Sequence, residues 1–526
     1  MPKQKRTQSE VCDLEHSNTH QHSRKKGDLS SKPQKHHWKN LRKGAKYEAS
    51  TEISGHEVDP IFSGHPKSIH ILSSPSPIRQ ALLSWYATVE TNRGMPWRKP
   101  YNPNLGSKER AQRAYEVWVS EVMLQQTQVI TVIPYYNTWM KKFPTVAHLA
   151  KSSVDEVNAL WKGLGYYSRG GRLLDAAQII IRDYQGKLPD NAKEMEANIP
   201  GIGRYSAGAI SSIAYGERVP VLDGNVHRLL SRFLALHALP KSKATLDTLW
   251  AAATAMVKDE VNDMDHPGDI NQALIELGST ICKIRNPSCS DCPLNAWCGA
   301  YNKPKRQQSV PDIEDLCTLC EPLTEEQNGV MAYPMKVKKR KARIEVDAVS
   351  VIEWRSVDDR QFLLVRRPDN GLLAGLYEFP ATSLDSNHTL NGPGLALQQL
   401  LDVVEDSVTS YNEEFPRGFQ REYSGASEYH MVDVVPMGNV LHTFSHIKKT
   451  YLAQWVVIEG GIKPPQLKCG PGQPELNHEE CRTSRNALWL SISEITKANI
   501  STGVSKIWKL FLTMGEQESN CSVSTQ

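Results

Sequence analysis

The sequence predicts a two-part protein, an all-helical domain followed by an α+β domain, from three observations. Apolar residues recur at helical spacing from Ile78 to about residue 300, as in 115–129, 154–160, 172–184, 205–215, 226–234 and 271–282. After Arg343 the pattern changes, and 346–352, 362–365 and 451–458 predict strands. A cluster of cysteines stands between the two patterns.

These patterns divide the chain into five expected parts. Residues 1–75 are rich in Lys, His, Ser and Gln and poor in aromatic residues, so we expect a disordered basic tail. Residues 76–300 form the helical domain, 301–343 a polar linker, 344–515 the α+β domain and 516–526 a short tail.

Composition excludes several classes of protein. No run of about 18 apolar residues occurs, which argues against a membrane protein, and the start lacks the apolar core of a secretory signal. The net charge of +4 permits nucleic-acid binding without indicating it. Six of the ten cysteines lie between Cys282 and Cys320, which favours metal binding in a reducing compartment over disulfides.

Four cysteines carry the first chemical signal, with the spacing C-x6-C-x2-C-x5-C: Cys282, Cys289, Cys292 and Cys298. Zinc sites usually combine two C-x-x-C pairs, whereas here one close pair has two outliers. The spacing resembles the iron–sulfur loop of the endonuclease III and MutY glycosylases, which implies a [4Fe–4S] cluster. Within the loop, Lys283 and Arg285 either contact DNA phosphates or are simply solvated.

A glycine hairpin and an aspartate form the second signal. Gly201 and Gly203 permit a tight turn between two helices, where backbone N–H groups and a helix N-terminus can bind a phosphate. Asp223 follows Gly203 by 20 residues, immediately before a helix. Alone it would be a plain N-cap. Together with the hairpin it resembles the catalytic aspartate of helix-hairpin-helix glycosylases, and we expect the helix N-terminus to keep it ionised.

The third signal is Glu121, which lies among apolar neighbours in the string Ser120–Val129 of an expected helix. Burial there should raise its pKa, as a general acid requires. The string resembles the MutY signature, and further matches at 95–98, 163–169 and 271–273 extend the resemblance over about 80–515. The chain is therefore identified as a member of the MutY-type adenine DNA glycosylases.

The resemblance implies a role for each matching residue. Glu121 would protonate the extruded adenine and Asp223 would stabilise the sugar cation, while Tyr205 and Asn225 would orient them. Further residues would contact the lesion or the adenine: Gln126, Thr127, Leu164, Tyr166 and Gln272. Core packing is the alternative for Leu164 and Tyr166. The lyases of the endonuclease III class carry a lysine nucleophile where this chain has Tyr205, so we expect a monofunctional enzyme.

The α+β domain resembles the Nudix-like domain of MutY proteins over 366–380. Where a Nudix hydrolase holds Mg²⁺ with a run of glutamates, 395–407 offers only Asp402, Glu405 and Asp406, so we expect binding without hydrolysis. The resemblance implies that the loop Phe444, Ser445 and His446 recognises 8-oxoguanine, with a simple strand-end turn as the alternative.

A second metal site is a candidate in the linker. Animal members of the family bind zinc there through three cysteines and an upstream histidine. This chain has Cys317 and Cys320 but lacks the third cysteine. His70 is the best candidate histidine, followed by His65. Three ligands and a water would be unusual for a structural zinc, so occupancy stays open.

We therefore expect a monomeric enzyme that removes adenine opposite 8-oxoguanine or guanine in double-stranded DNA. The main alternative is an endonuclease III-like glycosylase and AP lyase; a non-enzymatic lesion-binding protein would not need both Glu121 and Asp223. The linker is a candidate docking site for repair or replication factors. The basic run 338–341 predicts nuclear import or a solvated linker, and a mitochondrial location stays open.

Overall fold

The computed structural model describes residues 65–258, 265–302, 315–323, 329–337, 341–368, 371–384, 392–410, 429–444, 446–468 and 486–523. The helical domain contains, in chain order, η1 (Lys67–His70), α1 (Pro75–Val89), α2 (Ser107–Leu124), α3 (Val129–Lys142), α4 (Val146–Ala150), α5 (Val154–Trp161), α6 (Ser168–Tyr184), α7 (Ala192–Asn198), α8 (Arg204–Ile210), the π-helical turn η2 (Ser211–Tyr215), α9 (Gly224–Phe233), α10 (Lys243–Val257), α11 (Pro267–Thr280), η3 (Asn295–Trp297), α12 (Gly299–Asn302) and η6 (Val330–Ala332).

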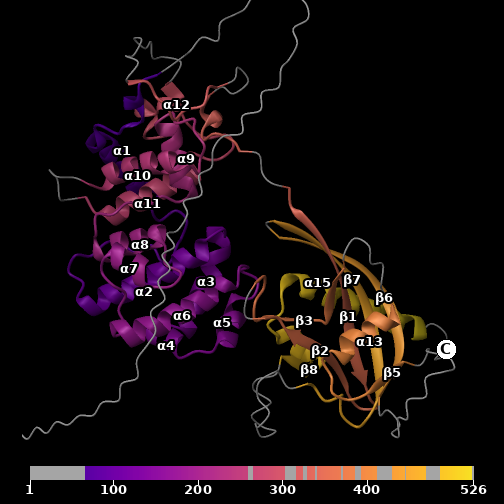
Figure 1. Cartoon of the computed structure of the whole chain (residues 1–526). Coiled ribbons are helices and arrows are strands. Elements are labelled where there is room, and N and C mark those ends of the chain that lie inside the picture. The colour runs from indigo at the N-terminus through magenta and orange to yellow at the C-terminus, as the bar shows by residue number, and fades with distance from the viewer. Residues whose placement is uncertain are drawn as a thin grey trace, which may run out of the picture. The chain divides into compact units, whose positions relative to one another are not determined.

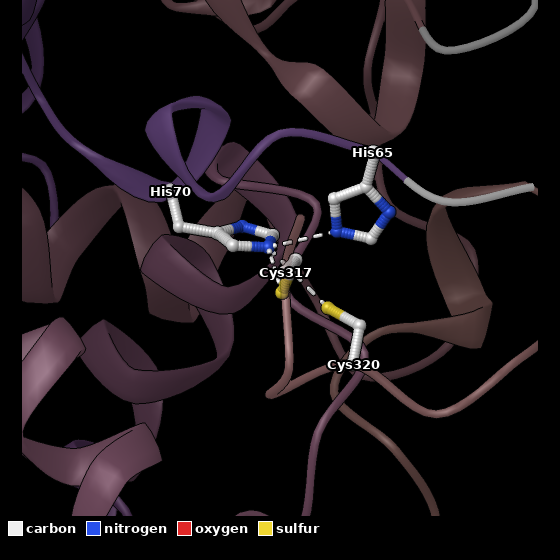
Figure 2. A group of neighbouring side chains, drawn as sticks. All are labelled: His65, His70, Cys317 and Cys320. Atoms are coloured by element: carbon white, nitrogen blue, oxygen red, sulfur yellow. Dashed lines mark hydrogen bonds between the residues drawn. The ribbon is translucent and has the colours of Figure 1, made fainter. Parts of the chain in front are cut away.

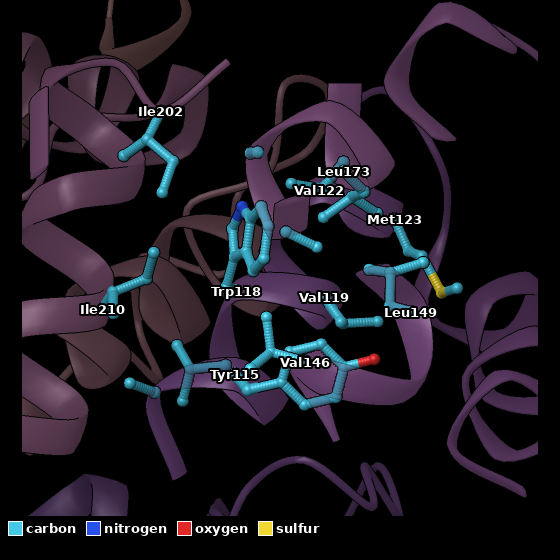
Figure 3. Packing of buried hydrophobic residues seen from close by; sticks show 14 of the residues in the cluster. Tyr115, Trp118, Val119, Val122, Met123, Val146, Leu149, Leu173, Ile202 and Ile210 are labelled. Atoms are coloured by element: carbon cyan, nitrogen blue, oxygen red, sulfur yellow. The ribbon is translucent and has the colours of Figure 1, made fainter. Parts of the chain in front are cut away.

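Most buried apolar residues in the described part of the helical domain belong to two cores. One surrounds α2, where Tyr115, Trp118 and Met123 are almost fully buried against residues of α4, α6 and α8 (Figure 3). The other joins α1, α9, α10 and α11. Because a buried tryptophan contributes about 3–5 kcal/mol relative to alanine, these cores hold the helices in fixed positions from which the site is built.

The helix containing Glu121 ends earlier than the sequence predicts. The periodic pattern suggests one helix over 115–129, but α2 ends at Leu124 and α3 begins at Val129. Gln126 between them has a φ of 56°, which is incompatible with a continuous helix. Apolar residues therefore continue at helical spacing across a turn, and Gln126 and Thr127 lie in a loop.

The ordered chain begins earlier than predicted, and part of the linker packs against the helical domain. His70, which falls in the expected tail of 1–75, is buried. In the expected linker, the Cys317 N–H donates to the carbonyl of His65 (2.9 Å), the Glu321 N–H donates to the carbonyl of His237 (2.8 Å), and Tyr333 is buried. The polar composition of both segments hid these tertiary contacts, which depend on a few specific residues.

The C-terminal domain is a mixed sheet between helices (Figure 1). Its described elements are β1 (Arg343–Arg355), β2 (Arg360–Arg366), β3 (Tyr377–Glu378), β4 (Ala381–Leu384), α13 (Pro393–Leu401), β5 (Val408–Ser410), β6 (Tyr429–Thr443), β7 (Ile447–Gly460), β8 (Ala487–Leu490), α14 (Ile492–Lys497) and α15 (Thr502–Val523). The strand order is β3-β2-β1-β7-β6-β5, with β4 paired to β1 and β8 to β2; β1 and β7 are parallel.

Both faces of this sheet are covered. On β7, Trp455 and Val457 pack with residues of α15, whereas Val456 and Ile458 pack with residues of α13. Central strands buried on both faces should be apolar throughout, which explains why 346–352 and 451–458 predicted strands without alternation. Among the described residues, no helix is both long enough and apolar enough to span a membrane.

Candidate active site and metal centres

The catalytic residues predicted from the sequence meet in one place. A cavity of about 1300 Å³ opens in the helical domain, and its walls include Glu121, Tyr205, Asp223, Asn225 and Gln272. These residues come from α2, α8, the start of α9 and α11, so only the fold brings them together. The cavity is large enough for an extruded nucleotide, because small-molecule sites typically measure about 300–1000 Å³.

Glu121 lies in the last turn of α2, and the hydroxyl of Tyr205 donates to its Oε2 at 2.7 Å. Burial raises the pKa of Glu121 to about 7, and the negative charge of Asp223 acts in the same direction. The hydrogen bond from Tyr205 and the charge of Arg98 oppose this shift. A carboxyl group with this pKa can both donate and accept a proton near neutral pH.

Asp223 is the N-cap of α9, and three donors orient its carboxylate. Its Oδ1 accepts from the N–H groups of Asn225 (2.9 Å) and Val226 (2.7 Å), and its Oδ2 accepts from Nδ2 of Asn225 (2.8 Å). Burial raises the pKa of Asp223, and these donors oppose the shift. The sequence predicted only the helix N-terminus, which lowers the pKa of Asp223. In the structure, burial has the larger effect and raises this pKa.

Sequence reasoning missed Glu276 on α11, whose side chain is 2 % exposed. It accepts from Nη2 of Arg98 (2.9 Å) and Nη1 of Arg93 (3.2 Å). Both arginines line the cavity, so the buried carboxylate behind them holds two cationic side chains at its wall. The only available signal was that Glu276 follows Gln272 by four residues and therefore shares its helix face.

The four loop cysteines line a single small cavity, beside α9, as their spacing predicted. Nη1 of Arg232 lies 3.2 Å from Sγ of Cys282. Burial raises the pKa of Cys292 to about 12 and that of Cys298 to about 11. Positive charge from a metal would stabilise the thiolate forms against this burial, so four thiols around one cavity fit a metal centre with four sulfur ligands.

A chain of hydrogen bonds links the cysteine loop to Asp223. Nη2 of Arg228 donates to Oδ1 of Asn225 (2.9 Å), which holds Asp223, and Nε of Arg228 donates to the carbonyl of Cys282 (2.9 Å). The cysteine loop therefore supports the first turn of α9, where the aspartate lies.

Comparison with known proteins assigns the family. The model of the HhH-GPD superfamily of base excision DNA repair proteins matches residues 119–254, and a NUDIX domain model matches 354–510. The adenine DNA glycosylase of Homo sapiens is 38% identical over 460 residues, which cover 84% of this chain and 75% of that protein. This chain belongs to the adenine DNA glycosylases. The Schizosaccharomyces pombe enzyme is 36% identical over 71% of the chain and 80% of its own length.

The glycosylase therefore acts on DNA and hydrolyses the N-glycosidic bond of adenine. Among solved structures, a thermostable thymine-DNA glycosylase aligns over 44% of this chain and 97% of its own, with 23% identity and a TM-score of 0.37. The C-terminal domain of mouse MUTYH, solved with human PCNA, aligns over 33% of this chain and 90% of its own, with 24% identity and a TM-score of 0.22.

The residues with implied lesion contacts differ in exposure. Gln126 is exposed, Thr127 is half-buried, and Tyr166 is 47 % exposed with a φ of 49°. Leu164 is only 6 % exposed and packs in the core of the helical domain, which agrees with the core-packing alternative. In the hairpin, Gly201 and Gly203 are both exposed, and Gly203 caps α8.

A second group of metal ligands lies where the linker meets the start of the ordered chain (Figure 2). The ligand atoms of His65, His70, Cys317 and Cys320 lie within 4.8 Å of one another. Nε2 of His70 is 3.1 Å from Nε2 of His65, 3.3 Å from Sγ of Cys317 and 3.4 Å from Sγ of Cys320. The structure thus brings in His65, which the sequence offered only as the second choice.

The loop with the implied 8-oxoguanine contacts joins β6 to β7. The N–H of Phe444 donates to the carbonyl of Ile447 (2.8 Å), and the N–H of Arg343 donates to the carbonyl of His446 (3.0 Å). Phe444 is half-buried and His446 is exposed, whereas Ser445 lies outside the described residues. The described part of the loop is a hairpin tip held by backbone hydrogen bonds.

Proposed function

We propose that this glycosylase removes adenine paired with 8-oxoguanine, and with guanine, and that it does so without a lyase step. The main support for the proposed catalysis is that two carboxyl groups, those of Glu121 and Asp223, line one cavity. Glu121 has a pKa of about 7, and Asp223 is oriented by three donors. Two carboxyl groups with different environments are what cleavage of a glycosidic bond requires.

In the proposed reaction, the adenine leaves the base stack and enters the cavity, because the sugar cannot be attacked while the base is stacked. The protonated Glu121 donates to N7 of adenine, the bond between N9 and C1′ breaks, and its electron pair stays with the base. Asp223 stabilises the positive sugar. Glu121, now ionised, accepts a proton from water as the water oxygen bonds to C1′. Tyr205 orients Glu121 through its 2.7 Å hydrogen bond.

The absence of an amine nucleophile supports the monofunctional assignment. A lyase step needs an amine that forms a Schiff base with the sugar. Among the described residues that line the cavity none is a lysine, and position 205 carries a tyrosine. The endonuclease III-like alternative therefore lacks its nucleophile.

The test is adenine release under single-turnover conditions from a duplex with one 8-oxoguanine:adenine pair, compared with Glu121→Gln. We expect release by the parent, a loss of about 10²–10⁴-fold in the variant, and strand breaks only after alkali. Strand cleavage without alkali would contradict the monofunctional assignment. If the intact parent released no adenine from this duplex but did so opposite guanine, the proposed lesion would be wrong.

For the cofactors, we propose a [4Fe–4S] cluster on Cys282, Cys289, Cys292 and Cys298. Such a cluster would hold the loop in place through its sulfur ligands, and the loop in turn supports α9 through Arg228 and Arg232. The purified protein should be brown and contain about four irons per chain. Cys292→Ser should lose iron, whereas Cys521→Ser, outside the loop, should not.

We also propose a structural zinc held by His65, His70, Cys317 and Cys320. Zinc bonds of 2.0–2.1 Å to nitrogen and 2.3 Å to sulfur place tetrahedral ligand atoms about 3.3–3.8 Å apart, close to the distances around His70. Burial lowers the pKa of His70, which favours the neutral imidazole that binds metal. Its Nδ1 lies 2.9 Å from the carbonyl of Leu234, so Nε2 faces the group.

Metal analysis tests this site independently of activity. Protein purified with zinc supplied should contain one zinc per chain besides iron, and His65→Ala should lose the zinc while keeping the iron. His148→Ala, at an exposed position of α4, is the control. If His65→Ala retained zinc at the parent level, His65 would not be the fourth ligand.

A further inference from the structure

Arg169, near the start of α6, is a buried cation with an unusual set of partners. Its side chain is among the buried ones, with the residue 5 % exposed, and its guanidinium donates mainly to backbone carbonyls. The acceptors within 3.1 Å are the carbonyls of Val122 (2.7 Å), Met123 (3.1 Å), Gln125 (2.7 Å) and Gly165 (3.0 Å). Longer contacts reach Oγ1 of Thr127 (3.5 Å) and the carbonyls of Leu164 (3.4 Å) and Tyr166 (3.4 Å).

These acceptors belong to two separate segments of the chain. Nη1 donates to two carbonyls near the end of α2 and to the carbonyl of Gln125. Nη2 and Nε donate to carbonyls of the turn 164–166. One planar group thus holds both segments at a fixed distance from each other. Arginine is suited to this, because its fork presents several donors in a rigid plane, whereas lysine presents a single point charge.

Each segment contains a residue in the left-handed region that side chains rarely adopt. Gln126 has a φ of 56° and Tyr166 a φ of 49°. Such conformations cost free energy and persist only where the surroundings determine them. Arg169 binds the carbonyl just before Gln126, and it binds the carbonyls of Gly165 and Tyr166 in the other turn. Its guanidinium also lies 5.5 Å from the centre of the Tyr166 ring.

We infer that Arg169 is a positioning residue that fixes the two loops of Gln126 and Tyr166 relative to each other and thereby determines selectivity for 8-oxoguanine. This inference rests on the proposed function, since the lesion contacts of these loops are part of it. Arg169 itself does not line the catalytic cavity. Its loss should therefore change which opposite base is preferred more than it changes the bond-breaking step.

The experiment compares Arg169→Lys with Arg182→Lys. Arg182 lies on the same helix, its side chain is 70 % exposed, and it forms an ion pair with the neighbouring Asp183. Single-turnover adenine release is measured from matched duplexes with 8-oxoguanine:adenine and guanine:adenine pairs, and melting temperature and cluster absorbance monitor the fold. We expect Arg169→Lys to lower the ratio of the two rates by about tenfold or more, as loss of charged hydrogen bonds predicts. Arg182→Lys should keep the parent ratio.

Two outcomes would overturn the inference. A folded Arg169→Lys protein with the parent ratio would show that the contacts do not set selectivity, and an equal fall of both rates would show a general structural role. The parent ratio is a separate readout. A parent without preference for 8-oxoguanine would refute the proposed lesion and the inference together, whereas a preference that Arg169→Lys retains refutes the inference alone.

A double-mutant cycle covers the case in which Arg169→Lys does not fold. Gln126→Ala and Tyr166→Ala leave Arg169 and its backbone acceptors in place. If one guanidinium couples the two loops, the combined loss of 8-oxoguanine preference should differ from the product of the separate losses. Multiplicative losses would overturn the inference.

Discussion

The hydroxyl of Tyr205 donates a hydrogen bond to Glu121, and the surroundings of this pair set the pKa of the Glu121 carboxyl group. Burial favours the neutral carboxyl group of Glu121, whereas the hydroxyl of Tyr205 favours the ionised one. Burial also raises the pKa of Tyr205 well above its ordinary value, so its hydroxyl stays a donor. Burial thus keeps about half of Glu121 protonated at pH 7, and ionisation of this carboxyl group lowers the stability of the folded state.

That cost should be measurable as a pH-dependent stability. The folded-state pKa of Glu121 is about 7 against an ordinary value of 4.5, so its contribution to stability is fully present below pH 4.5 and is lost as pH rises through 7. Glu121→Gln avoids this loss. We expect its melting temperature, relative to the parent, to increase between pH 5.5 and pH 8. The exposed Glu196→Gln is the control, and a difference that stays constant with pH would contradict the prediction.

Tyr205→Phe should shift the pH dependence of catalysis. Removing the hydroxyl deletes a hydrogen bond that lowers the pKa of Glu121, so this pKa should rise and the protonated acid should persist to higher pH. The alkaline limb of the single-turnover rate should therefore move to higher pH. Tyr215→Phe loses a comparable hydrogen bond to the carbonyl of Leu188 outside the cavity and should leave the limb in place. A shift of the limb toward lower pH would contradict the conclusion that the Tyr205 hydrogen bond lowers the pKa of Glu121.

Among the elements, α9 connects Asp223 to the cysteine loop 282–298. Asp223 caps its N-terminus, and Arg228 and Arg232 on the same helix bind the carbonyl of Cys282. The position of this helix depends on its close packing with α11 at Gly278, where an added Cβ would lie 2.8 Å from the carbonyl oxygen of Asn225.

Gly278→Ala should therefore destabilise the protein and displace the first turn of α9. Overpacking of this kind costs about 1–3 kcal/mol, and we expect a lower melting temperature together with slower adenine release. Gly171→Ala in α6 is the matched control, because its Cβ would meet nothing within 4 Å and alanine favours a helix by about 0.5–1 kcal/mol. Equal stability of the two variants would show that the close approach of Gly278 to Asn225 leaves room for a methyl group.

At the scale of the molecule, the proposed catalytic carboxyl groups and the proposed lesion contacts of the loop between β6 and β7 lie on different domains. The described residues that line the cavity around Glu121 all lie between Asn92 and Ile284, whereas Phe444 and His446 lie in the loop between β6 and β7 of the C-terminal domain. That domain depends on an aromatic cluster in which Phe511 of α15 packs against Phe362, Trp455 and Trp508.

Phe511→Ala should weaken the preference for 8-oxoguanine without abolishing adenine release. Truncation of such a buried ring costs about 3–5 kcal/mol, so the C-terminal domain should lose its packing. We expect a reduced preference for 8-oxoguanine over guanine, with adenine release opposite guanine largely kept. Lys509→Ala, at an exposed position of the same helix, is the control. A parent-like preference in Phe511→Ala would place lesion selectivity elsewhere.

The sequence by itself determined the features that depend on neighbours along the chain. The cysteine spacing, the N-cap position of Asp223, the apolar surroundings of Glu121 and the buried strands were all predicted, because helix and strand geometry relate residues only a few positions apart. The same local signals misplaced the end of α2, since apolar spacing does not register a turn at Gln126.

Only the tertiary structure decided which distant groups pair. Arg93 and Glu276 are 183 positions apart, His70 and Cys317 are 247 apart, and Arg169 binds carbonyls more than 40 positions away. The choice of His65 as a candidate ligand and the burial of Leu164 also belong here. Such pairs follow from how the cores place whole helices, and packing leaves no periodic signal in the sequence.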